Sequence, residues 1–224
     1  MTNTIYLVRH GENPANITRE FSYKLVDYSL TPRGIQQAQQ TAAYFKAKNI
    51  HEVYASPLKR ARETAEIIAQ ELKLPVTLME QFREINVGLL EQQPPTDENW
   101  GLHDRILQDW IAGKHETMFV GGEDYIILLA RMRAGLQEIT RAKKDRNIVV
   151  VGHIGIFTRT IGDICSNVDQ EQLMNTKSPN CSITEIELAT DDERVIGTLK
   201  CWAPCTHLNG YAAELLPGRS QKGG

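Results

Sequence analysis

The stretch Ile5-Tyr6-Leu7-Val8-Arg9-His10-Gly11-Glu12 is a short apolar run that ends in charged and polar residues. A second apolar run, Ile148-Val149-Val150-Val151, is followed by Gly152 and a second histidine, His153. Such runs are typical of buried parallel strands, and open α/β sheets bind their ligands at the carboxyl ends of these strands. One histidine there is more often an ordinary core residue. Two in equivalent positions, one beside an arginine, indicate a ligand site.

The rest of the hydrophobic pattern alternates between strands and helices. Segments rich in Val, Ile or Leu predict strands near residues 4–9, 52–55, 76–78, 147–152, 182–188 and 194–201. Apolar stripes predict a helix from Ser56-Pro57, with Ser56 as its N-cap, and another from Thr31-Pro32, with Ile35 among its inward residues. A third helix follows Gly121-Gly122, and a polar helix spans Asp97 to Ala112.

This alternation predicts an α/β fold, with a mostly parallel central sheet and helices on both faces, as in an α/β/α sandwich. The last two β segments are expected to form an antiparallel edge. Residues 1–216 are expected to form a single domain, with the irregular segment 85–122 inserted as a substrate lid. Residues 217–224 are expected to form a disordered tail.

The composition limits the classes of partner. The 224 residues suffice for a substantial core, and 25 basic against 28 acidic residues give no support for nucleic-acid or membrane-surface binding. The longest purely apolar stretch, 126–130, is far too short to span a membrane. We therefore expect neither nucleic acid nor a membrane as partner. The polar residues that follow the predicted strands indicate a small phosphorylated metabolite instead. The antiparallel edge strand offers a possible homodimer surface.

Four cysteines, Cys165, Cys181, Cys201 and Cys205, are present, and Met1-Thr2-Asn3-Thr4 leads into the first predicted strand without a signal-peptide pattern. We therefore expect a reducing, cytoplasmic setting with free thiols. The spacing Cys201-x3-Cys205-x-His207 is not a standard zinc pattern, so no metal site is predicted.

The polar side chains that follow the predicted strands suit phosphate chemistry. They are Arg9, His10, Ser56, Arg60, Glu84 and His153. Arginine presents a planar fork that matches phosphate oxygens, and a helix N-terminus adds backbone donors. Arg60 lies in the first turn of its predicted helix, where a cation is intrinsically unfavourable. A bound anion would explain that position.

Two histidines, two arginines and a carboxylate suit phosphoryl transfer through a covalent phosphohistidine. The attacking imidazole nitrogen must be neutral, and its tautomer is fixed if the other nitrogen donates to a backbone carbonyl. Cations then stabilise the charge on the equatorial oxygens. Glu84 would protonate the leaving oxygen, which calls for partial desolvation of its carboxyl group. Neither a metal ion nor a cofactor is required.

Several motifs, taken in order, resemble those of the histidine phosphatase superfamily, in its phosphoglycerate-mutase-like branch. They are Arg9-His10-Gly11-Glu12, Leu30-Thr31-Pro32-Arg33-Gly34, Ser56-Pro57-Leu58-Lys59-Arg60-Ala61, Glu84-x3-Gly88-x2-Glu91, Gly121-Gly122-Glu123 and Gly152-His153. The ordered set, which runs from residue 5 to about residue 160, is far more specific than any single motif. Asn13, Leu90 and Phe21-Ser22-Tyr23 depart from the family pattern, which puts the identity of the substrate in doubt.

The resemblance implies roles for individual residues. His10 resembles the phosphorylated nucleophile, Glu84 the proton donor, and Arg9, Arg60, His153 and Asn16 the phosphate pocket. It also places Gly11, Ser22 and the backbone amide of Ile154 at the substrate. Glu123 resembles a family position near the pocket, but at the start of a helix it is equally a favourable charge.

The charge of segment 85–122 bears on the choice between hydrolysis and phosphate transfer within one substrate. Mutases of this branch carry a longer, basic-rich insertion, whereas this segment holds two basic and six acidic residues. Such a lid would repel a second phosphate or carboxylate. We therefore expect a phosphatase acting on a small phosphomonoester with a weakly charged remainder, with a cofactor-dependent phosphoglycerate mutase as the alternative. A non-catalytic phospholigand-binding module is a third interpretation, disfavoured because a binder needs no positioned acid such as Glu84.

Overall fold

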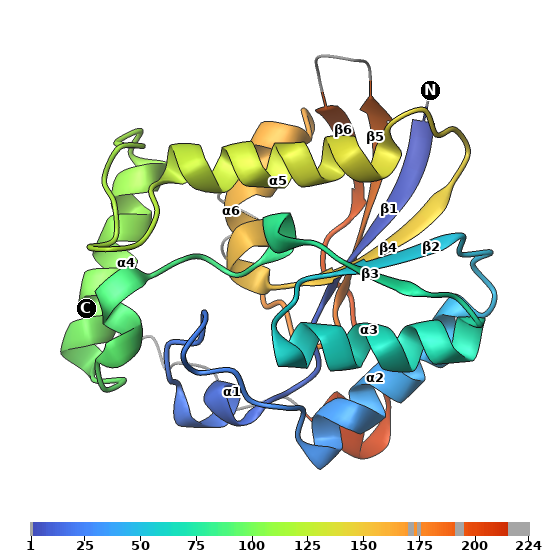
Figure 1. The fold of residues 1–224 in the computed structure, drawn as a ribbon, viewed down its shortest axis with the longest axis horizontal. Coiled ribbons are helices and arrows are strands. Elements are labelled where there is room, and N and C mark those ends of the chain that lie inside the picture. Colours follow the sequence, from blue (N-terminus) through green and yellow to red (C-terminus); the bar gives the residue numbers. More distant parts are fainter. Residues whose placement is uncertain (1, 170–172, 174–175, 191–194, 215–224) are drawn as a thin grey trace.

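The structure is a computed structural model that describes residues 2–169, 173, 176–190 and 195–214 (Figure 1). Its strands form a six-stranded sheet in the order β3-β2-β4-β1-β5-β6. Their bounds are β1 Thr2–Arg9, β2 Glu52–Ala55, β3 Val76–Leu78, β4 Asn147–Gly152, β5 Ile183–Thr190 and β6 Val195–Cys201. Each lies close to its predicted position. The tail predicted for residues 217–224 falls outside the described part of the chain.

The sheet is parallel except at one edge. Strands β3, β2, β4 and β1 pair in parallel, while β5 and β6 are added antiparallel, as predicted. In the register of β1 and β4, Arg9 lies opposite Gly152. The His10 amide donates to the Gly152 carbonyl at 3.0 Å. His10 and His153 therefore leave neighbouring strands at the same level.

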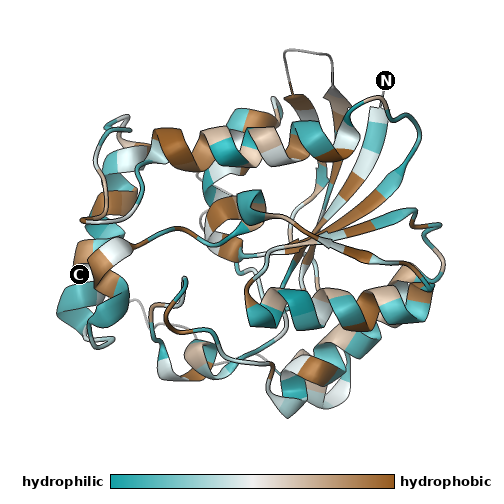
Figure 2. Cartoon of the chain, in the orientation of Figure 1, coloured by the Kyte–Doolittle hydropathy of each residue, from teal (hydrophilic) through white to brown (hydrophobic). Residues whose placement is uncertain are grey.

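Helices cover both faces of the sheet (Figure 1). Because side chains alternate between the faces of a strand, Tyr6 and Val8 pack with α2 and α3, while Ile5 and Leu7 pack with α5 and α6. In Figure 2 the covering helices alternate between hydrophobic and hydrophilic residues, as amphipathic helices do. The α-helices are α1 Pro14–Thr18, α2 Pro32–Phe45, α3 Lys59–Leu72, α4 Asp97–Ile111, α5 Tyr125–Thr140 and α6 Ile154–Ile164, and the short 3₁₀ turns are η1 Glu80–Phe82, η2 Gly88–Gln92 and η3 Gly210–Ala213.

Two predictions about helix starts had different outcomes. Helix α2 begins as predicted, with the Thr31 side chain accepting from the Gly34 amide. The prediction that Ser56 is the N-cap of the next helix was wrong, because α3 begins at Lys59 and its N-cap is Leu58. The Ser56 hydroxyl instead contacts His153.

Ile35 of α2, predicted to face inward, is 40% exposed.

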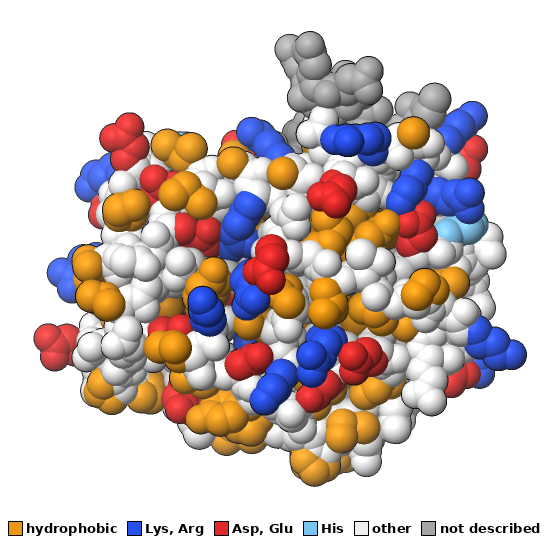
Figure 3. Space-filling view, in the orientation of Figure 1, with side chains coloured by type: hydrophobic (Ala, Val, Ile, Leu, Met, Phe, Trp, Pro, Cys, Tyr) orange, Lys and Arg blue, Asp and Glu red, His pale blue; other side chains and the backbone are white. Residues whose placement is uncertain are grey.

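The inserted segment 85–122 contains η2 and α4 and lies beyond the carboxyl edge of the sheet (Figure 1). On the surface shown in Figure 3, basic and acidic side chains are interspersed rather than gathered into a patch of one sign. Within the described residues, no helix is long and apolar enough to cross a membrane.

The outer edge of β6 is engaged by the chain that follows α6. Cys165 pairs with Gly197 in an isolated bridge, and the Asn167 side chain bonds both the amide and the carbonyl of Leu199. These contacts occupy main-chain groups that an edge-to-edge dimer would need. The edge strand considered as a homodimer surface is therefore partly covered.

Candidate active site

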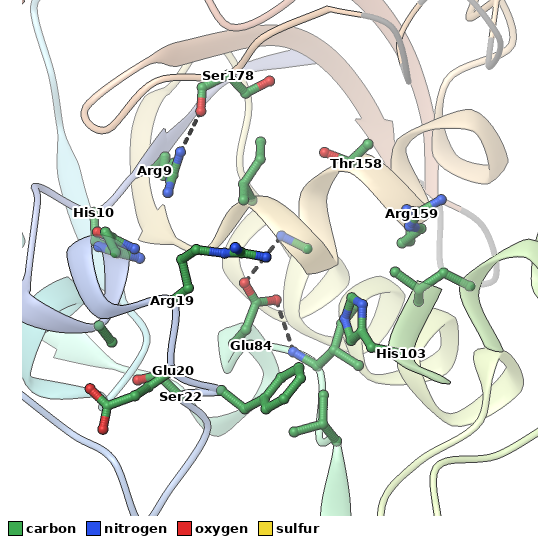
Figure 4. A pocket seen from close by; sticks show the side chains of 18 of the residues that line it. Arg9, His10, Arg19, Glu20, Ser22, Glu84, His103, Thr158, Arg159 and Ser178 are labelled. Carbon is green, nitrogen blue, oxygen red and sulfur yellow. Dashed lines mark hydrogen bonds between the residues drawn. The ribbon is translucent and has the colours of Figure 1, made fainter. Parts of the chain in front are cut away.

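A cavity of about 580 Å³ lies at the carboxyl ends of the parallel strands (Figure 4). Seven of the residues predicted for the site line it: Arg9, His10, Asn16, Ser22, Arg60, Glu84 and Ile154. Three others, Gly11, Glu123 and His153, are not part of the lining. The topology thus brings together residues that are distant in the sequence, and it leaves the three exceptions to be explained.

The His10 side chain is held in a single tautomer by two hydrogen bonds. Its Nδ1 lies 2.7 Å from the Gly11 carbonyl, which can only accept, so Nδ1 carries the proton. Its Nε2 lies 3.1 Å from Arg60 Nε, which can only donate, so Nε2 presents a lone pair. This is the arrangement that the sequence argument required of a nucleophilic imidazole.

The electrostatic surroundings keep His10 neutral. Its side chain is almost wholly buried, and burial lowers its pKa well below the usual value, with further lowering by the positive charges of Arg60 and Arg9. Burial also lowers the pKa of both Arg9 and Arg60 to about 10, and the negative charge of Glu84 opposes that shift. The nucleophilic nitrogen is therefore unprotonated, while the arginines remain charged at neutral pH.

His153 lies directly against His10 but beneath the open cavity. The two ring centroids are 5.2 Å apart, and His153 is fully buried. Its Nε2 lies 2.8 Å from the Ser56 hydroxyl, while its Nδ1 has no hydrogen-bond partner among the described residues. The predicted contact of His153 with phosphate remains a prediction.

Arg60 is fastened in place by the loop that follows α1. Its guanidinium donates to the Ser22 hydroxyl at 2.9 Å and to the Ser22 carbonyl at 2.8 Å. That loop is in turn held by Glu91, whose Oε1 accepts from the four successive amides of residues 23–26. The loop thus fixes the arginine that lies beside the His10 imidazole.

Arg9 and Asn16 line the same cavity as His10. An Arg9 nitrogen donates to the Ser178 carbonyl at 2.6 Å (Figure 4). Asn16 Oδ1 accepts at 3.0 Å from Asn180 Nδ2, which also donates to the His10 carbonyl at 3.0 Å. Both side chains are therefore held by segments that follow α6.

Glu84 bonds to the N-terminus of α6. Its Oε1 accepts from the amides of Ile85 and Ile156 at 2.8 and 3.0 Å, and its Oε2 accepts from the Gly155 amide at 3.1 Å. A β-carbon at position 155 would lie only 2.4 Å from Glu84 Oε1. The glycine therefore leaves room for the carboxyl group.

This contact leads to a first prediction. We expect Gly155→Ala to displace the Glu84 carboxyl and to lower kcat roughly 10- to 100-fold, because general acid catalysis depends on its position. Gly101→Ala is a matched control, since a β-carbon there meets no atom within 4 Å. It should leave kcat unchanged and raise the free energy of unfolding by about 0.5–1 kcal/mol, as alanine does within a helix. Equal kcat values for the two variants would contradict the role of Gly155.

The buried histidines lead to a second prediction, on stability. Burial lowers the pKa of His10 and His153 well below the usual value and that of His207 to about 4. Below about pH 6.5 the unfolded chain binds protons that the folded chain does not, so the free energy of unfolding should fall as the pH drops. The free energy of unfolding should be higher at pH 7.5 than at pH 5, and we expect His207→Gln to reduce that difference by about 1–2 kcal/mol. Urea unfolding of both proteins at the two pH values measures this, and identical pH dependence would contradict the assignment.

Two of the residues predicted to contact the substrate, Glu123 and Gly11, do not line the cavity. Glu123 accepts from the Asn86 amide and pairs with Arg131 at 2.8 Å, away from the cavity. It also precedes α5, whose N-cap is Asp124. Gly11 does not face the cavity either. Its carbonyl orients His10, and a β-carbon there would lie 2.6 Å from the Gly34 carbonyl.

The acidic residues of segment 85–122 lie outside the cavity lining, although two of them act on arginines that line it. The segment contributes Trp100, His103 and Leu107 of α4 to the cavity, and none of its acidic residues. The Asp97 side chain is 92% exposed, and that of Glu91 serves the loop amides. Asp97 pairs with Arg19 at 3.8 Å and the negative charge of Asp104 acts on Arg159, so the segment offsets part of the positive charge of the cavity.

Sequence reasoning missed several cavity residues. Asn13 is fully buried, and neither polar atom of its side chain has a partner among the described residues. Arg19, Arg159 and His103 also line the cavity. Asn13 was noted only as a departure from the family pattern, and no local motif marks Arg159.

Comparisons with known proteins agree with this geometry. A model of the histidine phosphatase superfamily (branch 1) matches residues 5–199. The chain is 30% identical over 207 residues to the uncharacterized phosphatase PhoE of Bacillus subtilis strain 168. The matched region covers 92% of this chain and 97% of PhoE. The chain is 31% identical over 191 residues to the probable phosphoglycerate mutase GpmB of Erwinia tasmaniensis, and the matched region covers 82% of this chain and 84% of GpmB.

Among solved structures, a similar fold is found in a phosphoserine phosphatase from Entamoeba histolytica in complex with 3-phosphoglyceric acid. The TM-score is 0.74 and the sequence identity 25%, over 92% of this chain and 100% of that one. The comparison of sequences and the comparison of structures therefore each include a protein named as a phosphatase.

Proposed function

Because this chain belongs to branch 1 of the histidine phosphatase superfamily, we propose that it hydrolyses a small phosphomonoester through a phosphohistidine formed on His10. The observation that carries the proposal is the state of the His10 ring. Its Nδ1 is bonded to a carbonyl, its Nε2 presents a lone pair to the cavity end occupied by Arg60, and burial keeps the ring neutral.

In the first step, His10 Nε2 forms a bond to phosphorus while the bond between phosphorus and the leaving oxygen breaks. For this step Glu84 must be in its protonated form; it donates that proton to the leaving oxygen, and an alcohol departs. Arg9 and Arg60 stabilise the charge on the equatorial oxygens, together with Asn16 and His153. In the second step, water attacks phosphorus, its proton passes to Glu84, and inorganic phosphate leaves with restoration of the free His10.

The test is a single-turnover reaction with a ³²P-labelled aryl phosphate. We expect acid-labile label on His10, followed by release of phosphate in amounts equal to the released phenol. We also expect EDTA to leave turnover unchanged, because the arginines supply the positive charge for the transition state. Strong inhibition by EDTA, or turnover without a labelled histidine, would overturn the proposal.

A phosphoglycerate mutase is the second candidate, favoured by the similarity to GpmB. It predicts interconversion of phosphoglycerates that depends on a bisphosphorylated cofactor, with negligible release of phosphate. A non-catalytic phospholigand-binding module predicts phosphate binding without turnover, unaffected by His10→Ala. Release of phosphate separates the phosphatase from both alternatives, and interconversion of phosphoglycerates separates the mutase from the binding module.

We further propose that the protein acts on its metabolite in the cytoplasm. Its four cysteines are free, and two of them, Cys165 and Cys181, are buried. Burial raises the pKa of both thiols to about 12, which keeps them protonated and unreactive. Free cysteine thiols without disulfides are typical of proteins in a reducing compartment.

A further inference from the structure

Resting on the proposed phosphatase function, we propose that the side-chain amide of Asn13 binds the transferred phosphate, by donating a hydrogen bond from Nδ2 to one of its oxygens. Asn13 lies three residues after His10 and lines the same cavity. Its side chain is fully buried. Asn13 thus adds a phosphate ligand to the arginines and to Asn16.

The Asn13 amide is a buried polar group that the protein leaves without a partner. Neither its Nδ2 nor its Oδ1 forms a hydrogen bond with any residue that the structure describes. Burying an amide without a hydrogen bond costs free energy, and nearly all buried polar groups in native proteins are therefore paired. A ligand that accepts from Nδ2 removes that cost when it binds.

Buried polar atoms without a partner are concentrated around His10. Six such atoms occur in the described part of the chain, and four of them belong to residues that line the cavity or lie against the His10 ring. These four are Arg9 Nε, the two polar atoms of Asn13 and His153 Nδ1. Phosphate oxygens accept hydrogen bonds from several donors at once, with charge assistance. One phosphate beside His10 can therefore serve both Arg9 Nε and Asn13 Nδ2.

Helix capping does not occupy the Asn13 donor. Asn13 is the N-cap residue of α1 and faces Asn16 as in a capping box, which turns Oδ1 toward the Asn16 backbone amide. That amide bonds to the Asn13 backbone carbonyl at 3.0 Å, and the Asn13 side chain forms no capping hydrogen bond. Capping would in any case use only the oxygen of the amide group. The nitrogen, which can only donate, remains for a group that only accepts.

Two other asparagines hold the backbone of Asn13 in place relative to His10. The Asn13 backbone amide donates to Asn16 Oδ1 at 3.2 Å. Asn180 Nδ2 donates to the same oxygen and to the His10 carbonyl, both at 3.0 Å. The Asn13 donor is therefore positioned before a substrate arrives. Such preorganised donors are the ones that stabilise charge in a transition state.

Asn13→Leu tests the contact, because leucine has the same branching and number of heavy atoms but no donor. From calorimetry, we expect the Kd of inorganic phosphate to rise about 10- to 100-fold, as for the loss of a hydrogen bond to a charged group. The value of kcat/KM for 4-nitrophenyl phosphate should fall by a similar factor, because the equatorial oxygens remain charged in the transition state. Asn209→Leu is the matched control at an exposed asparagine outside the cavity lining and should leave both values unchanged.

Asn13→Asp separates a phosphate ligand from a helix cap. Aspartate caps helices as well as asparagine does, but an ionised carboxylate has no donor and repels an anion. A ligand role predicts that, at pH 8, Asn13→Asp binds phosphate more weakly than Asn13→Leu, while Asn209→Asp binds it like wild type. A capping role predicts that Asn13→Asp binds phosphate like wild type.

The inference is overturned if Asn13→Leu binds phosphate as tightly as wild type, or if Asn13→Asp does. Should Asn13→Leu not fold, Asn13→Asp decides by the same Kd. Failure of wild type to hydrolyse 4-nitrophenyl phosphate would instead refute the proposed function. The Kd of inorganic phosphate does not depend on turnover, so it would still test the role of Asn13.

Discussion

Replacing His10 by alanine is expected to abolish turnover of 4-nitrophenyl phosphate, with a loss on the order of 10⁴-fold or more in kcat. The reason is that the covalent route has no substitute for the Nε2 lone pair. Arg9 and Arg60 remain in the variant, so binding of inorganic phosphate, measured by calorimetry, should persist. The measurement is the steady-state rate of nitrophenol release, together with the absence of ³²P label on the protein.

His115→Ala is the control, since His115 is an exposed histidine of the segment before α5 and is outside the cavity. It should retain full turnover and full labelling. A His10→Ala variant that keeps more than a tenth of wild-type turnover would assign the nucleophile to another group. Loss of phosphate binding together with turnover would point to a collapsed pocket rather than to a missing nucleophile.

Replacing Glu84 by glutamine is expected to reduce kcat/KM for glycerol 3-phosphate by about 10²-fold or more, and for 4-nitrophenyl phosphate by much less. An alkoxide is a poor leaving group and needs a proton, whereas nitrophenolate leaves without one. Glutamine has nearly the same shape, and its oxygen can still accept from the amides of Ile85 and Ile156, but its NH2 group cannot accept from the Gly155 amide. The variant therefore removes the acid at the cost of one hydrogen bond to α6.

The quantity to measure is kcat/KM for each substrate, because it includes leaving-group departure but not the later hydrolysis of the phosphohistidine. Glu98→Gln on the exposed surface of α4 serves as the control and should change neither value. An equal loss for the alkyl and the aryl substrate would remove Glu84 from the role of proton donor. Its bonds to α6 would then be purely structural.

Local pattern was sufficient for the elements and for the convergence of the main groups. The apolar runs before His10 and before His153 marked two strands, and the rule for parallel sheets placed both histidines at one edge. The structure confirms both strands and their parallel pairing. Arg60 and Glu84 could be assigned to the same edge because each follows a predicted strand.

Local pattern failed where the direction of a side chain depended on distant packing. Glu123 fitted a pocket position and a charge at a helix start equally well, and Arg131 and the Asn86 amide hold it outside the cavity lining. Ser56 looked like a helix cap, yet its hydroxyl contacts His153, which is 97 residues away. The acidic residues of segment 85–122 were counted as a group, although α4 turns Trp100, His103 and Leu107 toward the cavity.

By itself, the sequence determined the succession of strands and helices along the chain, the two histidines that follow strands, and the type of chemistry. Hydrophobic periodicity and residue type are local properties, so they can be read without the tertiary structure. The tertiary structure alone decided the tautomer of His10, the hydrogen bonds of the Glu84 carboxyl group to α6, and the approach of Arg19 and Arg159 to one cavity. Those features depend on distances between residues up to 140 positions apart, which are set by packing across the sheet and which no local pattern encodes.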